Sequence, residues 1–177
     1  IRNQFAIWHF SENTGNVAYD ATSNQNDVII TGATWTSSLM GYALSFNGNS
    51  DDVTVPHSLS LDITGQFSVQ AWIQSTGTNS YYAIVDKYEY NPAGSKGFTL
   101  YISSGILRFS IYSGAVGIAD VFGTTELRDN TYHHVMASWD GSFMSVYVDG
   151  NLEGQAPWSN PPASTTQSVG IGMRLSG

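Results

Sequence analysis

The stretch that most constrains the fold of this chain runs from residue 132 to residue 154 and reads YHHVMASWDGSFMSVYVDGNLEG. It contains two runs of alternating character, and each run closes with an Asp-Gly pair, Asp140-Gly141 and then Asp149-Gly150. Asp-Gly between such runs favours a tight hairpin, because glycine adopts a positive φ angle at little cost and aspartate hydrogen-bonds its own backbone. Two successive hairpins predict a β-meander of antiparallel strands.

Strand-like segments with turn residues between them recur along the rest of the chain, as is typical of an antiparallel sandwich. The clearest is Phe67–Gln74, in which every second residue from Phe67 to Ile73 is apolar. On a strand these residues face the core and Trp72 faces away, so that Trp72 is either covered by a loop or exposed on the sheet. Because Trp8, Trp72 and Trp139 lie inside expected strands, we expect them to belong to the core and not to a ligand site. No segment shows a sustained helical period. The expected strands are Phe5–Phe10, Asp27–Ile30, Ala43–Phe46, Asp52–Val55, Phe67–Gln74, Tyr82–Asp86, Phe98–Ile102, Leu107–Tyr112, Tyr132–Trp139, Phe143–Val148 and Ser168–Met173.

The charge balance restricts the possible partners. The chain has 177 residues, with 14 acidic side chains against 6 basic ones, a formal net charge of −8 and no cysteine. The absence of cysteine excludes a disulfide framework and thiolate metal sites. The negative charge argues against nucleic acid and anionic membrane surfaces, where phosphate neutralisation supplies most of the affinity. It is compatible with calcium or with a neutral polysaccharide.

Composition also indicates the kind of environment in which the chain works. Only 11% of its residues are charged and 13% are aromatic, while Gly, Ser, Thr and Asn are abundant. This mixture is typical of secreted all-β modules, so we expect a secreted, extracellular or cell-surface location. No apolar stretch is long enough to span a membrane, and membrane insertion is not expected.

The motifs of common hydrolases are missing from the sequence. Glycoside hydrolysis needs two carboxyl groups that flank the scissile bond, and none of the four glutamates lies in a Glu-x-Asp-x-x-Glu array. There is no Gly-x-Ser-x-Gly nucleophile motif. His133 and His134 are adjacent, so on a strand their rings point to opposite faces and cannot chelate one ion together. The chain is therefore not predicted to be an enzyme, although an enzyme domain elsewhere in a parent protein remains compatible with it.

Five segments follow one another along nearly the whole chain: Ala6–Asp27, Gly41–Ser58, Phe67–Ser75, Asn130–Gly154 and Ser168–Gly177. They contain the motifs ALSFNG, FSVQAWI, YHHVMASW and VYVDG. In this order they resemble laminin-G-like, concanavalin A-type jelly rolls in their bacterial and pentraxin-like form. Tyr132 stands where this family usually has tryptophan. The resemblance implies an all-β fold, a two-sheet antiparallel β-sandwich, with residues 1–177 as a single domain and module of a larger protein. The family normally continues into one more strand, so either the fold lacks its last strand or a neighbouring segment fills that position of the sheet.

The same resemblance implies a structural calcium ion. Ca²⁺ takes six to eight oxygen ligands, and two segments rich in carboxylate and amide oxygens, 20–27 and 47–52, could supply them. The alternative is that these Asn, Asp and Ser side chains serve turns by hydrogen-bonding the backbone. The candidate ligands are Asp20, Asn24 and Asn26 in the first segment, and Asp51 and Asp52 in the second.

Two long loops carry the residues expected to bind a ligand, Lys87–Gly97 and Gln155–Gln167. A sugar ring stacks its apolar face on an aromatic side chain while amides and carboxylates bind its hydroxyls. Trp158 could instead cap the end of the sandwich. We expect a non-catalytic, lectin-like module for glycan or polysaccharide; the alternative is a protein-interaction, adhesion or spacer domain that contacts neighbouring domains of its parent chain. The candidate ligand-binding residues are Tyr82, Tyr88, Glu89, Tyr90, Asn91, Trp158 and Asn160.

Overall fold

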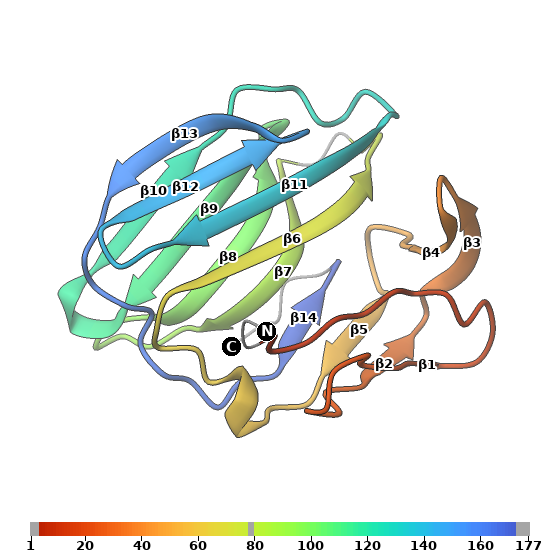
Figure 1. Ribbon diagram of the computed structural model, residues 1–177, viewed down its shortest axis with the longest axis horizontal. Helices are drawn as coiled ribbons and strands as arrows, with labels where there is room; N and C mark the ends of the chain where they lie inside the picture. Colours follow the sequence, from red (N-terminus) through yellow and green to blue (C-terminus); the bar gives the residue numbers. More distant parts are fainter. Residues whose placement is uncertain (1–3, 78–79, 173–177) are drawn as a thin grey trace.

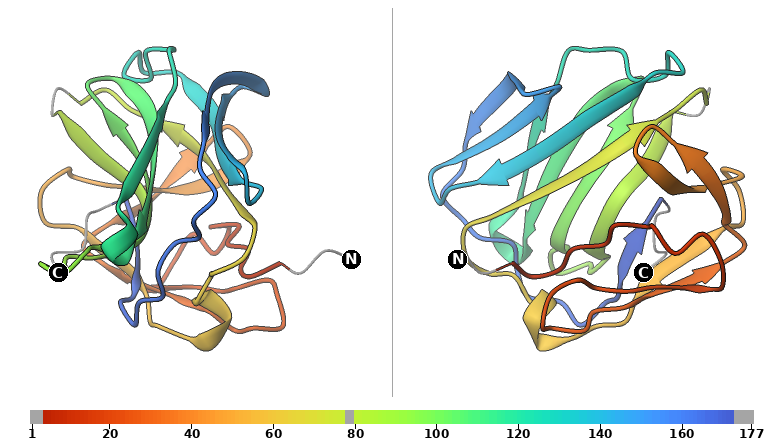
Figure 2. Two further views of the ribbon diagram at one scale, coloured as in Figure 1. Left: turned by 90° about the vertical axis from the view of Figure 1, so that its left-hand side faces the viewer. Right: turned by 45° about the vertical axis from the view of Figure 1, so that its right-hand side comes forward.

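Two antiparallel sheets pack face to face in the computed structural model, which describes residues 4–77 and 80–172 (Figure 1). The larger sheet has the strand order β1-β2-β5-β14-β7-β8-β9-β10, the smaller has the order β13-β12-β11-β6, and β3 and β4 form a separate hairpin. Viewed edge-on, the two sheets form distinct layers (Figure 2). The predicted all-β sandwich is confirmed. Its strands are β1 Val17–Ala18, β2 Val28–Thr31, β3 Thr34–Ser38, β4 Gly41–Ser45, β5 Asp52–Val55, β6 Phe67–Gln74, β7 Tyr81–Glu89, β8 Lys96–Ser103, β9 Ile106–Ser113, β10 Ile118–Phe122, β11 Tyr132–Trp139, β12 Phe143–Val148, β13 Asn151–Pro157 and β14 Val169–Ile171.

The predicted meander forms strands β11, β12 and β13 of the smaller sheet. Asp149 and Gly150, which join β12 to β13, have φ angles of 50° and 82°. A two-residue type I′ turn requires positive φ at both of its central residues, and Asp-Gly is a preferred pair there. The local sequence therefore determines this hairpin.

The main hydrophobic core lies between the smaller sheet and strands β7 to β10 of the larger sheet. Its fully buried members include Leu100, Leu107, Phe109 and Leu127. Burying a side chain of this size contributes about 1.5–3 kcal/mol. A second cluster is built around β2, β5 and β14, and the chain from residue 5 to residue 10 packs against it.

Residues 5–10 are not the strand that we expected. Only one bridge, between Trp8 and Asp20, links this segment to another part of the sheet. Phe10 has a φ angle of 51°, which interrupts an extended conformation. The segment is fixed by packing of its apolar side chains and by the Trp8 indole, which donates to the Asn26 carbonyl oxygen (2.7 Å).

The two predicted loops are shorter than expected, because their ends belong to strands. Residues 87–89 complete β7, residues 96–97 begin β8, and residues 155–157 complete β13. The list of expected strands also lacks β1, β3, β10 and β13. These are short strands, strands at the edge of a sheet or exposed ones, whose apolar alternation is weak because little of each strand is buried.

Residues 4–77 and 80–172 also include two short 3-10 helices, η1 Leu59–Leu61 and η2 Gly114–Val116. Within the described residues, no helix has the length and apolar character needed to cross a bilayer. Strand β14 occupies an interior position of the larger sheet, between β5 and β7. Met173, the end of the last expected strand, lies outside the described residues.

Candidate ligand-binding surfaces

The residues predicted to bind sugar do not form one cluster. Tyr82 and Glu89 lie near opposite ends of β7, since Tyr82 pairs with Ile102 and Glu89 with Lys96. Seven residues of extended strand span about 23 Å. Tyr82 therefore cannot share a sugar ring with the residues around the β7–β8 turn.

The two tyrosines near that turn differ in exposure. Tyr88 is only 8% exposed, its hydroxyl lies 3.1 Å from the Ser95 hydroxyl, and its ring packs edge-on against Tyr112. No open ring face is left on it for a sugar. Tyr90 is 63% exposed and is the stacking candidate of this loop. The Asn91 side-chain oxygen accepts a backbone N–H two residues further on (2.9 Å) and so shapes the turn.

The Glu89 carboxylate connects the β7–β8 hairpin to the segment after β13. One oxygen accepts from the Lys96 ammonium (3.2 Å) and the other from the Thr165 hydroxyl (2.6 Å). The hydrogen bond from Thr165 has the largest effect on the pKa of Glu89, and together with that from Lys96 it holds this pKa below its ordinary value. Both carboxylate oxygens of Glu89 have protein partners, so these contacts hold the segment after β13 to the β7–β8 hairpin.

Residues 158–168 run along the edge of the sandwich from β13 to β14 (Figure 1) and are attached to it at many points. Lys87, almost fully buried, donates from its ammonium group to the Gln167 carbonyl oxygen (2.7 Å). Burial lowers the pKa of Lys87, and nearby Asp62 acts in the opposite direction. Further bonds join Ser113 to the Pro161 carbonyl oxygen (2.7 Å), the Ala163 N–H to the Tyr112 carbonyl oxygen (2.9 Å) and Ser164 to Asp62 (2.8 Å).

Trp158 and Asn160 lie in this attached segment, and both are half-buried. The Trp158 ring packs against the main core, and its carbonyl oxygen accepts from the Trp139 indole (2.7 Å). The structure thus supports the alternative in which Trp158 caps the sandwich end.

The Asp20 carboxylate organises the loop that was expected to bind calcium. One oxygen accepts from the N–H groups of Ile7 and Thr22 (both 2.9 Å), and the other from the Thr22 hydroxyl (2.8 Å) and the Asn26 N–H (3.0 Å). Burial raises the pKa of this carboxyl group, but the donated bonds outweigh burial and hold the pKa below its ordinary value. A carboxylate offers about four lone-pair positions, and protein donors take them.

Of the remaining candidate calcium ligands, Asn24, Asn26 and Asp51 have hydrogen-bond partners in the protein, whereas Asp52 has a buried carboxylate oxygen without a partner among the described residues. The Asn24 and Asn26 amides both donate to the Phe5 carbonyl oxygen (2.9 Å each). Asp51 accepts a backbone N–H of its own loop (2.7 Å), and Asp52 begins β5. Across residues 4–77 and 80–172, no three His, Asp or Glu side chains are grouped closely enough to hold a metal ion. The contacts of Asp20, Asn24, Asn26 and Asp51 are those of the alternative, in which these side chains serve the backbone, and the calcium ion stays a prediction.

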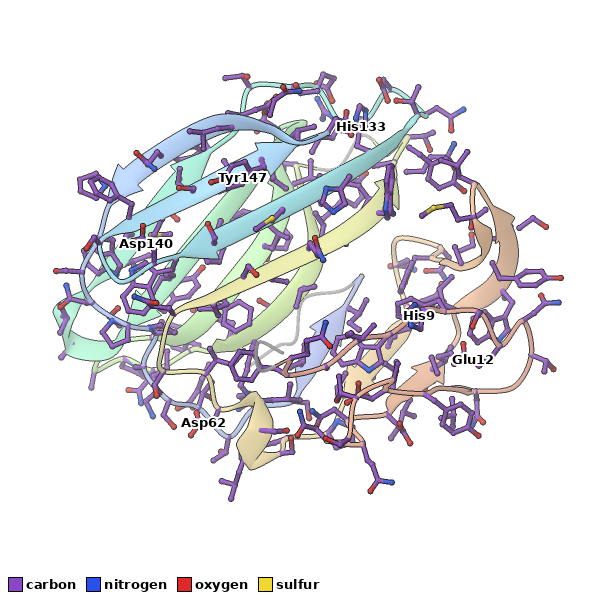
Figure 3. The ribbon with its side chains drawn as sticks, viewed as in Figure 1. His9, Glu12, Asp62, His133, Asp140 and Tyr147 are labelled. Carbon is purple, nitrogen blue, oxygen red and sulfur yellow. The ribbon has the colours of Figure 1, made fainter. Side chains whose placement is uncertain are left out.

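A different surface combines aromatic and hydrogen-bonding side chains in the open. We call it the neutral face: the side of β6, β11 and β12 that points away from the core, toward the viewer in Figure 3, where Tyr147 is labelled. The alternate residues of these strands are buried in the core. The neutral face consists of Ser68, Gln70, Trp72, Gln74, Tyr132, His134, Met136, Ser138, Phe143, Ser145 and Tyr147. Of these, Ser145 is buried, and its hydroxyl accepts from the Gln155 amide (3.1 Å).

Trp72 is the most prominent aromatic side chain of the neutral face, with half of its surface exposed. It pairs across strands with His134, and the two rings lie 5.4 Å apart between centroids with a tilt of 58°. The Nε2 atom of His134 is in turn 3.1 Å from the Gln70 side-chain oxygen. One edge of the Trp72 ring is thus supported while the ring remains open to solvent.

None of the side chains of the neutral face is Asp, Glu, Lys or Arg. Carboxylates flank it instead, because Asp140 lies in the β11–β12 turn and Asp149 in the β12–β13 turn, at opposite ends of β12. Asp140 accepts the N–H groups of Phe143 (2.7 Å) and Ser142 (2.8 Å), which lower its pKa. The result is a neutral surface between two negative ends.

His133 lies just behind one end of the neutral face and is buried (Figure 3). Its Nδ1 is 2.8 Å from Asp149, and its Nε2 is 2.9 Å from the Thr131 hydroxyl and 3.3 Å from Asp129. Burial lowers the pKa of His133, but the two aspartates outweigh burial and raise it above its ordinary value. We call His133 with Asp129 and Asp149 the histidine clamp. Asp149 also accepts the His134 N–H (2.9 Å), which connects the histidine clamp to the neutral face.

Sequence reasoning placed Trp72 on the side of its strand away from the core, but it favoured a core role for this residue and did not select it as a ligand-binding residue. The core role was wrong, because the structure leaves half of the Trp72 surface exposed. The useful signal was the run of Ser, Gln and Trp at alternate positions of residues 67–74, opposite the similar run in residues 132–139. The pairing of Trp72 with His134 depends on strand register, which only the structure shows.

The fold defines the class of protein as a concanavalin A-like jelly roll. The family model described as the concanavalin A-like lectin/glucanases superfamily, Laminin_G_3, matches residues 47–177. The chain belongs to this family, and the resemblance inferred from its sequence is confirmed. A comparison with curated protein sequences finds no match.

Several solved structures share the fold. The binding domain of botulinum neurotoxin serotype G aligns with a TM-score of 0.76 and 11% identity, over 96% of this chain and 43% of that chain. The binding domain of botulinum neurotoxin DC, in complex with rat synaptotagmin II, aligns with a TM-score of 0.72 and 16% identity, over 94% and 43%. A structure described by the dependence of botulinum neurotoxin type C cell entry on two ganglioside molecules gives 0.71 and 16%, over 94% and 42%. The chain thus spans less than half of these chains, and at such identities only the fold is shared.

Proposed function

We propose that this chain is a non-catalytic carbohydrate-binding module and that it holds its ligand on the neutral face. The observation that carries the proposal is the half-exposed Trp72, braced by His134 and surrounded by amide and hydroxyl side chains. Rigid aromatic rings with nearby hydrogen-bonding groups match the two chemical sides of a sugar, its apolar ring face and its hydroxyl rim. Placing these groups on paired strands keeps them preorganised.

The family and the structural neighbours support binding as the activity. The family is described as containing lectins and glucanases. The serotype G and DC neighbours are described as binding domains, and the type C neighbour is described by an interaction of the neurotoxin with gangliosides. The match covers 42% of the type C chain, so the ganglioside interaction belongs to a chain more than twice as long as the matched part. A secreted or cell-surface location belongs to the same proposal.

The chemistry of the neutral face supports binding without turnover. Glycoside hydrolysis requires two carboxyl groups beside the bond, and none of the side chains that make up this face carries one. Three of the glutamates are engaged elsewhere: Glu89 as described, Glu126 with Arg128 (2.7 Å) and Glu153 with the Thr124 N–H (2.8 Å).

A protein-interaction role is the second candidate. It is favoured by Leu39 and Met40 at the tip of the β3–β4 hairpin, which are 66% and 71% exposed. Large exposed apolar side chains that lie together are typical of contact sites for other proteins. The neighbour solved with rat synaptotagmin II shows that a protein with this fold can have a protein partner.

The proposal is tested by a glycan array together with pull-down on insoluble polysaccharides, using the wild type and Trp72→Ala. We expect Trp72→Ala to lose about fivefold or more in affinity, because one stacked ring is worth about 1–3 kcal/mol and about 1.4 kcal/mol corresponds to a factor of ten. Tyr19→Ala is the matched control, since Tyr19 is an exposed aromatic outside the neutral face.

Unchanged melting temperatures of both variants would show that the loss arises at the surface. If Trp72→Ala binds as tightly as the wild type, the neutral face is not the site. If the wild type binds no glycan on any support while a variant of the Leu39–Met40 tip loses a protein partner, the second candidate replaces the first.

A further inference from the structure

We infer that the ligand of the neutral face is an uncharged polysaccharide chain and that the module discriminates against anionic polymers of the same backbone. This inference rests on the proposed function and names the chemical class of its ligand. Its evidence is the set of side chains that form and flank the neutral face, together with the partners of the described Lys and Arg side chains.

Among the residues that the structure describes, no Lys or Arg belongs to the neutral face. Its only titratable nitrogen-containing side chain is His134, whose Nε2 is engaged with the Gln70 oxygen. A carboxylate or sulfate pressed against this surface would lose water without gaining an ionic partner, which is unfavourable. Neutral hydroxyls, in contrast, find amide and hydroxyl partners there.

The basic side chains that the structure describes have other roles. Lys96 pairs with Glu89, Arg108 with Asp120 and Arg128 with Glu126, and Lys87 is buried against residue 167. Arg2 and Arg174 lie outside the described residues. Within residues 4–77 and 80–172, each Lys or Arg thus has a partner away from the neutral face.

Negative charge stands at both ends of the neutral face. Asp140 and Asp149 are separated by the length of β12, about 20 Å, so a ligand at the centre lies about 10 Å from each. That distance is close to the Debye length at physiological salt. The repulsion is therefore secondary to the missing cationic partner, and it must weaken as salt is added.

The distance between the strand positions of Trp72 and Tyr147 indicates that the ligand is a chain of sugars and not a single sugar. Trp72 lies on β6, opposite His134, and Tyr147 lies on β12, opposite Met136. Two strand spacings and two residues along the strand place the backbones of Trp72 and Tyr147 roughly 12 Å apart. One pyranose ring cannot cover both positions, whereas consecutive sugars of a polysaccharide can.

The test uses pairs of polymers that share a backbone and differ in charge. Suitable pairs are hydroxyethylcellulose with carboxymethylcellulose, methyl-esterified with de-esterified homogalacturonan, and desialylated with sialylated N-glycans. Affinity is measured by affinity electrophoresis or calorimetry at low and high salt. We expect the neutral member of any bound pair to bind at least tenfold more tightly, with little effect of salt, and binding of its anionic partner to rise with salt.

A charge-insertion variant sharpens the test. Ser138→Lys places an ammonium group on the neutral face, between Ser68 and Ser145 in the strand register. It should raise affinity for the anionic member at least threefold, whereas Tyr19→Lys, the off-face control, should not. Equal or tighter binding of anionic members by the wild type, or an unchanged ratio in Ser138→Lys, overturns the inference and leaves the proposed function standing. Failure to bind either member of every pair and every glycan of the array defeats the proposed function itself.

Discussion

The two sheets differ in the partners of the polar side chains that point away from the main core. On the larger sheet, strands β7 to β10 carry outward-facing polar side chains that bind one another. Thr99 donates to Asp86 (2.6 Å), and Asp120 accepts from both Ser110 and Arg108, the latter at 2.6 Å. Asp86, Thr99 and Ser110 are almost completely buried. The polar groups of this side are matched within the protein.

The neutral face of the smaller sheet has fewer internal partners and no charge. Its cross-strand contacts include Trp72 with His134 and His134 with Gln70, and Trp72 remains half exposed. Both sides follow from the same strand alternation, in which every second residue points outward. Strand alternation therefore places polar side chains on the outward side of each sheet. Hydrogen bonds among these side chains then decide whether they stabilise the fold or remain available for a ligand.

The largest effect on this comparison is expected from Arg108→Ala on the larger sheet. Arg108 pairs with Asp120 and lies 4.5 Å from the centre of the Phe122 ring. Its removal leaves a partly buried carboxylate without its cation and should destabilise the fold by about 1–3 kcal/mol. Denaturant unfolding measures this, and glycan binding should be unchanged. Arg128→Ala, in an exposed ion pair with Glu126, is the control and should have little effect. Loss of binding in folded Arg108→Ala would contradict the separation of the two surfaces.

A pH-dependent effect of somewhat smaller size is expected from His133→Gln. The raised pKa of His133 means that its contribution is fully present below its ordinary pKa of about 6.5 and is lost as pH rises through the raised value. At pH 5.5 the variant should be less stable than the wild type by about 1–2 kcal/mol, because bonds to charged partners are lost.

The difference between His133→Gln and the wild type should shrink steadily toward pH 8.5 in thermal or urea unfolding. Asp129 and Asp149 act with the opposite sign: their lowered pKa values give stability that is lost only as pH falls below about 4. His134→Gln, on the exposed side of the same strand, is the matched control. If the stability difference between His133→Gln and the wild type grows from pH 5.5 to pH 8.5, the histidine clamp does not stabilise the fold through a charged His133.

A change at His134 should weaken binding without weakening the fold. His134→Ala removes the ring that braces Trp72, so we expect affinity for glycan to fall about threefold to tenfold through loss of preorganisation. Gln70→Ala should have a smaller effect in the same direction, since Gln70 acts through His134. Calorimetric titration measures both. Affinity unchanged in His134→Ala would show that the ring orientation does not depend on this contact.

The smallest effect is expected from chelation. Four protein hydrogen bonds occupy the Asp20 carboxylate, so melting with and without EDTA should give the same midpoint. Asp20→Asn keeps the shape of the side chain but loses acceptor capacity, and it should melt at a lower temperature regardless of chelator. A midpoint that falls in EDTA and recovers with added Ca²⁺ would restore the calcium ion implied by the family resemblance.

Much of the fold was predictable because its signals are local. The Asp149-Gly150 turn and the alternation in β6 and β11 are encoded within a few residues, and both were expected. The strand expected at residues 5–10 was wrong because its apolar residues pack against the second core without a neighbouring strand to extend the single bridge at Trp8.

The candidate site was less predictable, since loop composition does not show what a loop contacts. The segment around Trp158 has the aromatic, Pro and Asn content of a binding loop, yet bonds to Lys87, Glu89 and Ser113 attach it to the sandwich. Tyr88 was chosen for its loop position but belongs to β7 and is buried.

By itself, the sequence determined the strand alternation, the Asp-Gly hairpins, the excess of acidic residues and membership of a jelly-roll family. These are local or summed properties, and they do not depend on how distant segments meet. Only the tertiary structure decided that Trp72 stands open beside His134 while Tyr88 and Trp158 are covered. The physical reason is that exposure and cross-strand pairing depend on strand register and on packing between residues far apart in the chain.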